Sequence, residues 1–186
     1  MFGLAFSLFL YVGSNVAYTA DSQASLTQQW DQTHVPVAAS GDDASPVLAF
    51  ERPRLGYGQP LAKINVPSIK FVGVVLEGTD SRVLAGGPGH IPGTAYPGEP
   101  DNVVISNHNS YSLSWGSVKT GDLIELQTNY GSYKYRVTGF KIVDAHDTSV
   151  TGSSHPKPTL TFITCYPLWA GALATQRYVV FADLIQ

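Results

Sequence analysis

Short apolar or alternating runs, separated by turn residues, fill the chain from residue 61 to its end. Runs of this length, bounded by Gly, Pro, Asn and Asp, are typical of β-strands rather than helices. The turn at 86–89 reads Gly-Gly-Pro-Gly, and the turn at 97–100 reads Pro-Gly-Glu-Pro. The pattern predicts eight strands, over residues 61–66, 71–76, 82–85, 102–106, 122–127, 132–143, 158–164 and 178–184. Many strands with few helical stretches favour an all-β domain, an antiparallel-rich closed barrel or a sandwich.

The sixth of these runs changes phase in the middle. Tyr133, Tyr135 and Val137 alternate on one face, but beyond Gly139 the apolar positions are Phe140 and Ile142. An extra residue in one strand produces such a shift, and glycine is favoured where it occurs. The sequence therefore predicts a β-bulge at Gly139.

The N-terminal segment has a different pattern. Residues 2–20 carry no charge and would form a helix of about 28 Å, close to the thickness of the hydrocarbon core of a bilayer. We expect a retained membrane anchor, with a cleaved signal peptide or a buried soluble helix as alternatives. No Lys or Arg precedes Arg52, so the positive-inside rule does not indicate which end of the segment would face the cytoplasm.

Residues 21–60 mix polar, small, Pro and Gly residues without sustained periodicity, apart from a possible short helix at 25–30. This composition indicates a stalk, although Trp30 and Phe50 could pack back on the domain. We therefore expect three segments: an anchor or signal at 1–20, a linker at 21–60 and a β-rich domain at 61–186.

Composition and charge exclude several classes. Hydrophobic residues make up 44% and charged residues 13% of the chain, which argues against disorder and against a coiled coil. The net charge is −3 and no basic cluster is present, so we expect no nucleic-acid partner. The single cysteine excludes an internal disulfide and thiolate zinc frameworks, and we expect no metal and no cofactor.

Three residues with reactive or charged side chains stand at predicted strand ends: His108, Cys165 and Arg177. Taken singly, each has an ordinary explanation: a solvated loop histidine, a buried inert thiol and a surface ion-pair partner. Together they provide a nucleophile, a proton shuttle and an oxyanion donor. A free thiol is only a few per cent thiolate at neutral pH, so it needs an imidazole, and an always-charged guanidinium can bind an oxyanion. His90, in a Gly/Pro loop, is an alternative shuttle.

The strings that carry these residues resemble sortases. Thr-Leu-Thr-Phe-Ile-Thr-Cys, ending at Cys165, is similar to the TLxTC signature, and Gln-Arg-Tyr-Val-Val at 176–180 resembles the arginine strand. Gly-Pro-Gly-His at 87–90, Tyr-Pro-Gly-Glu at 96–99 and Tyr-Pro after the cysteine are similar to class D sortases in particular. The resemblance covers about residues 61–186. One departure is Asn-His-Asn at 107–109, where class D sortases usually have Gly-His-Arg.

The resemblance implies a closed eight-stranded sortase-type barrel and a membrane-anchored cysteine transpeptidase with no cofactor. Cys165 would form a thioester with the threonine of an LPxTG-like sorting signal, Arg177 would hold the oxyanion, and His108 would shuttle the proton. The acceptor would be an amine of a cell-wall precursor or of a pilin lysine. Thr164 and Tyr166 would contact the substrate, beside a loop at about 144–158.

The resemblance also implies a place for the protein, at the cell membrane as a single-pass protein with the catalytic domain outside the cytoplasm. Two other functions stay open. One is a non-catalytic anchored β-barrel that serves in binding or adhesion. The other is a different Cys–His peptidase, although the SxGC context of L,D-transpeptidases is missing around Cys165.

Overall fold

The computed structural model of the chain describes residues 2–33 and 55–186, and for residues 2–16 only the course of the backbone. Ten principal elements follow one another along the chain: α1 (Phe2–Thr33), β1 (Pro60–Val66), β2 (Phe71–Glu77), α2 (Ser81–Gly86), β3 (Gly89–His90), β4 (Asn102–Asn107), β5 (Leu123–Gln127), β6 (Ser132–Asp144), β7 (Thr159–Tyr166) and β8 (Gln176–Leu184). Short 3₁₀ helices lie between them: η1 (Pro67–Ile69), η2 (Asn109–Tyr111), η3 (Leu113–Ser117), η4 (Ser149–Thr151) and η5 (Gly171–Leu173).

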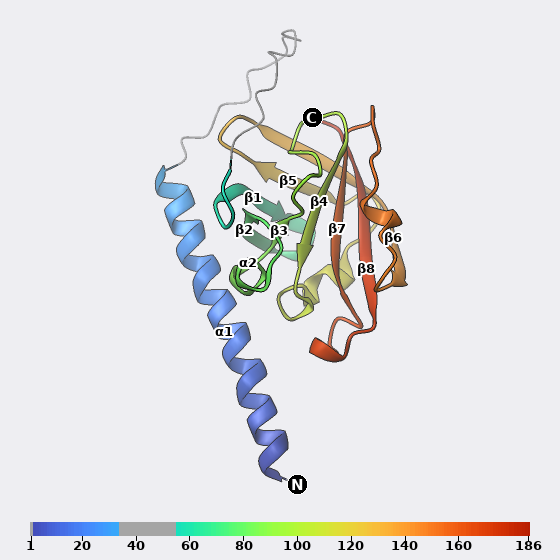
Figure 1. Cartoon of the computed structure of the whole chain (residues 1–186). Helices are drawn as coiled ribbons and strands as arrows, with labels where there is room; N and C mark the ends of the chain where they lie inside the picture. The colour runs from blue at the N-terminus through green and yellow to red at the C-terminus, as the bar shows by residue number, and fades with distance from the viewer. Residues whose placement is uncertain (1, 34–54) are drawn as a thin grey trace.

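The strands close into a barrel in the order β1-β2-β3-β4-β7-β8-β6-β5 (Figure 1). The pairs β2–β3 and β4–β7 are parallel, and the other pairs are antiparallel. The prediction of a closed eight-stranded barrel is thus confirmed.

One of the eight predicted strands is wrong. Residues 82–85 lie in the helix α2, whose N-cap Asp80 accepts hydrogen bonds from the backbone N–H groups of Arg82 and Val83, both at 2.9 Å. An apolar run this short does not distinguish strand from helix, and the capping aspartate is the local signal that decides it. The eighth strand is instead β3, which is two residues long.

The bulge in β6 is confirmed. The register between β6 and β8 shifts between Val137, opposite Ala182, and Gly139, opposite Phe181. The extra residue turns the second half of the strand, so that Phe140 and Ile142 are exposed to solvent.

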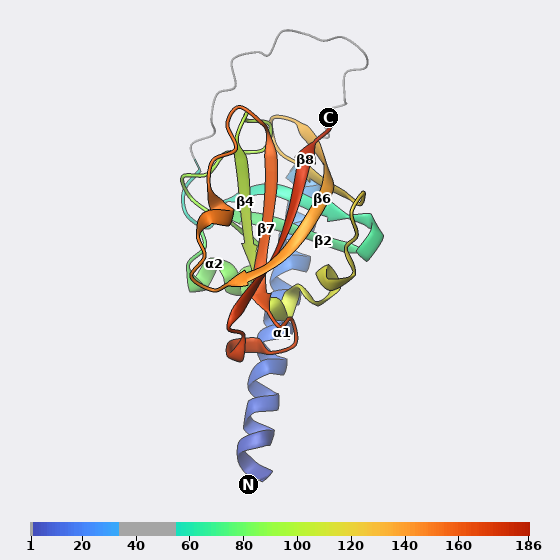
Figure 2. The same cartoon turned by 90° about the vertical axis from the view of Figure 1, so that its right-hand side faces the viewer.

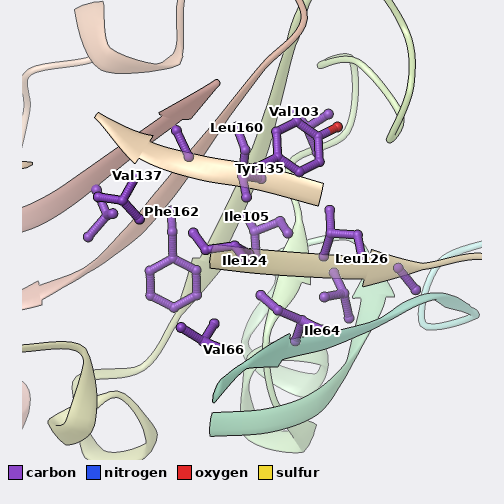
Figure 3. Close-up of a cluster of buried hydrophobic side chains, with 14 of the residues drawn as sticks. Ile64, Val66, Val103, Ile105, Ile124, Leu126, Tyr135, Val137, Leu160 and Phe162 are labelled. Atoms are coloured by element: carbon purple, nitrogen blue, oxygen red, sulfur yellow. The ribbon is translucent and has the colours of Figure 1, made fainter. Parts of the chain in front are cut away.

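The interior of the barrel is filled by alternate residues of the strands. Trp115 stacks on Phe162 with ring centroids 3.4 Å apart, and both are fully buried. Figure 3 shows side chains from β1, β4, β5, β6 and β7 meeting in this space. Burial of each large apolar side chain stabilises the fold by about 1.5–3 kcal/mol. The strands that carry the site therefore pack on a well-filled core.

Helix α1 packs along the barrel over β2 and α2 (Figure 1). Trp30 is buried against Val74 and Leu76, so this aromatic residue does pack back on the domain. The short helix expected at 25–30 is part of α1, which extends from the predicted anchor into the predicted linker and ends at Thr33. Residues 34–54 of the predicted linker, including Phe50, lie outside the described residues.

No helix within residues 2–33 and 55–186 is both long enough and apolar enough to cross a membrane. The boundaries of the anchor, linker and catalytic segments stay a prediction.

Candidate active site

Strands β4, β7 and β8 are neighbours in the barrel wall, and Figure 2 shows them side by side. The register places Cys165 of β7 directly opposite Arg177 of β8. On the other side of β7, Thr164 is opposite Asn107 of β4. His108 follows one residue later, at the level of Cys165. The structure therefore brings the three predicted catalytic residues together at one end of the barrel.

Alternation along β7 separates the nucleophile from its neighbours. Phe162 and Thr164 belong to the inward-facing set, so Cys165 lies on the outer face, where it is partly exposed and free of any disulfide. Thr164 is 1% exposed and its hydroxyl is among the buried polar groups with no hydrogen-bond partner. The side chain therefore points into the barrel and away from the outer face, and a contact between Thr164 and substrate stays a prediction.

Tyr166 is half-buried at the end of β7. Its side chain packs against the core, and its ring lies near that of Tyr178, with centroids 6.4 Å apart and planes at 29°. The inward direction follows from the same alternation that buries Thr164. A contact between Tyr166 and substrate stays a prediction.

The loop that carries His108 is held by hydrogen bonds between its own residues. The His108 carbonyl accepts hydrogen bonds from the Ser112 hydroxyl at 2.9 Å and from the Tyr111 N–H at 3.1 Å. His108 lies at the surface, yet partial burial of its imidazole lowers the pKa of the ring below its usual value. The neutral ring is therefore favoured near neutral pH.

Asn109, part of the departure from Gly-His-Arg, links this loop to the one that follows the cysteine. Its side-chain amide donates hydrogen bonds to the carbonyl oxygens of Pro167, at 3.3 Å, and Gly171, at 3.1 Å, and the residue is 4% exposed. Sequence reasoning assigned no role to Asn109, and the departure itself was the only signal. The asparagine ties the histidine loop to the cysteine loop.

Arg177 is half-exposed, and its Nη1 donates to the carbonyl of Gln176 at 3.0 Å. Among the described residues no carboxylate lies within ion-pair distance of its guanidinium. A partly exposed guanidinium without an acidic partner is available for a developing oxyanion.

A small apolar cluster is buried on the outer side of the sheet beside the cysteine. It consists of Val104, Ile163 and Val179, and Val150, from the loop between β6 and β7, packs against them. Farther along β7 and β8, a cavity of about 400 Å³ is lined by Val150, Thr161, Phe181 and others. The distance from Thr161 to Cys165 along the strand is about 13 Å, the span of four extended residues. We call this cavity, together with the outer face of β7 between Thr161 and Cys165, the outer groove.

His90 is not part of the site. Its side chain is fully buried, with Nδ1 2.8 Å from Glu77 Oε2 and Nε2 2.9 Å from the Ala95 carbonyl. Its ring also stacks on Tyr96 at 4.9 Å between centroids. Because both ring nitrogens are occupied inside the protein, His90 cannot serve as the alternative shuttle.

The barrel brings together a partly exposed thiol on β7, a guanidinium on β8 and an imidazole in the loop after β4, which define a candidate cysteine-dependent acyl-transfer site. The profile of the Sortase family, described as a sortase domain, matches residues 64–185. The chain belongs to the sortase family.

Individual relatives point to the same class as the sequence motifs. The chain is 34% identical over 129 residues to Sortase D of Bacillus subtilis (strain 168), a match that covers 69% of this chain and 65% of the relative. It therefore spans about two thirds of that relative's length. The resemblance to class D sortases is confirmed.

Solved structures of sortases have the same fold. The Sortase D5 transpeptidase of Clostridium perfringens superposes with a TM-score of 0.66 at 28% identity, covering 71% of this chain and 82% of the other. Sortase C-1 of Actinomyces oris gives a TM-score of 0.63 at 27% identity, with 68% and 75% covered.

Proposed function

We propose that this protein is a cysteine transpeptidase that cleaves an LPxTG-like sorting signal and transfers the acyl part to an amine. The observation that carries the proposal is the register that puts Cys165 opposite Arg177, with His108 at the same level of the neighbouring strand. Each of the three supplies a function that the chemistry requires.

In the first half of the reaction, the Cys165 thiolate attacks the carbonyl carbon of the signal's threonine. The carbonyl π electrons move to oxygen, and the Arg177 guanidinium stabilises the resulting oxyanion. As the oxyanion collapses, the C–N bond breaks and the His108 imidazolium donates its proton to the leaving amine. A thioester on Cys165 and a free amine on the departing peptide result.

In the second half, an incoming amine attacks the thioester. Neutral His108 takes the proton from the attacking nitrogen, the C–S bond breaks and the thiolate is regenerated with an imidazolium beside it. The cycle returns to its starting protonation state, so it consumes no cofactor.

The lowered pKa of His108 bears on the rate of this cycle. The acid that protonates the leaving amine is the imidazolium, and partial burial makes this form scarcer at neutral pH than for a free histidine. Only the fraction of molecules with a thiolate and an imidazolium together is active. We therefore expect a slow enzyme.

The outer groove offers both apolar and polar contacts to a peptide, because Lys141 and Asp183 line the cavity together with apolar side chains. A four-residue extended segment that begins at Cys165 reaches the level of Thr161, where Val150 and Phe181 line the cavity. The leucine and proline of an LPxTG-like signal would contact this apolar part, and the threonine would lie at the thiol. The proposal thus gives the loop between β6 and β7 the role of a substrate wall.

The partners and location that we propose follow from the family. The donors would be secreted surface proteins with a sorting signal, and the acceptor an amine of the cell wall or of a pilin. The uncharged segment 2–20 would attach the protein to the cell membrane as a single-pass anchor, with the catalytic domain outside the cytoplasm. Fractionation followed by carbonate extraction tests this, because a spanning segment resists extraction and a surface-bound one does not.

The test of the activity uses the full chain with a fluorogenic LPxTG-type peptide and hydroxylamine as the amine. Cleavage that depends on hydroxylamine and disappears in Cys165→Ala supports the proposal. Arg136→Ala is the matched control, because Arg136 is exposed on β6 and donates only to the Gly121 carbonyl. Cleavage unchanged in Cys165→Ala, or no cleavage of any peptide in an LPxTG-like library, would overturn it and favour the binding-module alternative.

A further inference from the structure

Three large apolar side chains stand out from the loops around the active site. Leu113 is 58% exposed, Trp169 82% and Leu173 81%. Leu113 belongs to the loop after β4, and Trp169 and Leu173 belong to the loop after β7. We call these three residues the apolar rim.

The two loops of the rim are tied together. The side chain of Asn109 forms two hydrogen bonds between them. In addition, Leu168 packs against Gly116, where a Cβ would be 2.8 Å from Leu168 Cδ1. The rim is therefore a single surface rather than the tips of two independent loops.

Other exposed apolar residues lie at the same end. Val72 is at the start of β2, which begins at this end of the barrel, and Ile142 is opposite Tyr178, one residue beyond Arg177. The exposed apolar side chains thus extend the rim toward neighbouring strands. Surfaces of this kind commonly mark a site of interaction.

The two loops that carry the rim contain no charged side chain. The sequence from 102 to 118 and the sequence from 159 to 176 contain no Asp, Glu, Lys or Arg. The charged or titratable groups nearest these loops are His108 and Arg177, while Asp144, opposite Gln176, and Lys70, before β2, lie farther along the same end of the barrel. Loops without charged side chains lose little hydration energy when they are covered.

The N-terminal part of α1 leaves the barrel in the same direction. Both views show this half of the helix running beyond the end of the barrel where η2 and η5 lie (Figures 1 and 2). Its sequence, residues 2–20, carries no charge. An uncharged helix and an uncharged apolar rim therefore face the same side of the molecule.

We propose that the apolar rim docks on a lipid bilayer, with Trp169 and Leu173 at the boundary between headgroups and acyl chains. Tryptophan prefers this boundary because its ring is apolar and its N–H can still reach polar groups. Continuity with the uncharged helix identifies the occupant as lipid, since both features would enter the same layer. The active site then opens close to the membrane surface, whatever reaction it performs.

The chain contains its own reporter for this contact. Of its three tryptophans, Trp30 is 2% exposed, Trp115 is 0% exposed and Trp169 alone is exposed. Full-length protein is mixed with phosphatidylcholine vesicles with and without brominated acyl chains. We expect a blue shift of the emission, protection from aqueous acrylamide and quenching by the brominated lipid. All three changes disappear in Trp169→Phe.

A binding measurement separates the rim from the helix. Trp169→Ser combined with Leu173→Ser should weaken the partition of the full chain into vesicles by about tenfold or more. The matched control is Tyr57→Ser combined with Ile185→Ser. These two exposed residues lie beside the last residue of β2 and after β8, at the opposite end of the barrel, and their loss should leave partition unchanged.

Three results would overturn the proposal. The first is saturated vesicle binding with Trp169 still open to acrylamide, which means that the helix alone attaches the chain. The second is no vesicle binding by the wild-type chain. The third is a lipid-free dimer that Trp169→Ser abolishes, which identifies a second copy as the occupant. None of these results depends on the transpeptidase reaction, so the proposed function is judged separately.

Discussion

Two parts of the barrel wall are built in different ways. On the wall formed by β4, β7 and β8, Asn102–Asn107 pairs with Thr159–Thr164 along its whole length, and Thr159–Tyr166 pairs without a break with β8. On the other side, β2 meets β3 over only two residues, Leu76 and Glu77. We call this second part the β2 seam.

The β2 seam is completed by a side chain from α1. The side-chain Oε1 of Gln23 accepts a hydrogen bond from the Val74 N–H at 2.6 Å. Its side-chain Nε2 donates to the backbone carbonyls of Val74, at 3.2 Å, and Gly86, at 2.7 Å. A buried glutamine here replaces the missing neighbouring strand. The wall of the active site thus fixes Cys165 and Arg177 by strand register, whereas the seam depends on a helix from outside the barrel.

The largest expected effect falls on the continuous wall. Arg177→Ala should lower kcat by about 10²–10³-fold, because it removes the donor to the oxyanion. Thermal unfolding should change little, since the guanidinium bonds only to the Gln176 carbonyl. A peptide cleavage assay and a melting curve measure the two. A variant that melts far below the wild type would show that Arg177 is structural, and the comparison of wall and seam would fail.

The next effect falls on the β2 seam. Gln23→Ala leaves buried backbone groups of Val74 and Gly86 without partners and should reduce the free energy of unfolding by about 2–3 kcal/mol. Gln28→Ala is the matched control, because Gln28 is exposed on the same helix. Urea titrations of both variants give the answer. Equal stability of the two would contradict the role of Gln23 in closing the seam.

The smallest effect is the titration of His108. Because partial burial lowers its pKa, the ¹H–¹³C signal of its ring should titrate with a midpoint below 6.5. The unfolded chain then binds the proton more readily than the folded one, so the contribution of His108 to stability falls as the pH drops below about 6.5. The His108→Gln variant identifies the His108 ring signal, because that signal is missing from the spectrum of the variant. A midpoint at or above 6.5 would mean that a neighbouring charge outweighs the burial.

The sequence predicted the parts of the molecule that depend on local signals. The ends of the apolar runs located β4, β7 and β8 closely enough to group His108, Cys165 and Arg177, and the phase change located the bulge near Gly139. These predictions succeeded because alternation and turn residues act over a few positions.

The rest depended on contacts between distant residues. No local pattern shows that Gln23 fills a gap beside Val74, which lies 51 positions away. Asn109 similarly acts on carbonyls in a loop 58 and 62 positions away. The inward direction of Thr164 follows from strand alternation, because adjacent residues of a strand face opposite sides of the sheet and Cys165 faces outward.

The most direct test of the account is the mass of the intact protein after brief exposure to an LPxTG-type peptide. The account predicts an adduct equal to the acyl part of the peptide, located on Cys165, released by hydroxylamine and absent in Cys165→Ala. Cleaved peptide without any adduct, or an adduct that persists in Cys165→Ala, would contradict it.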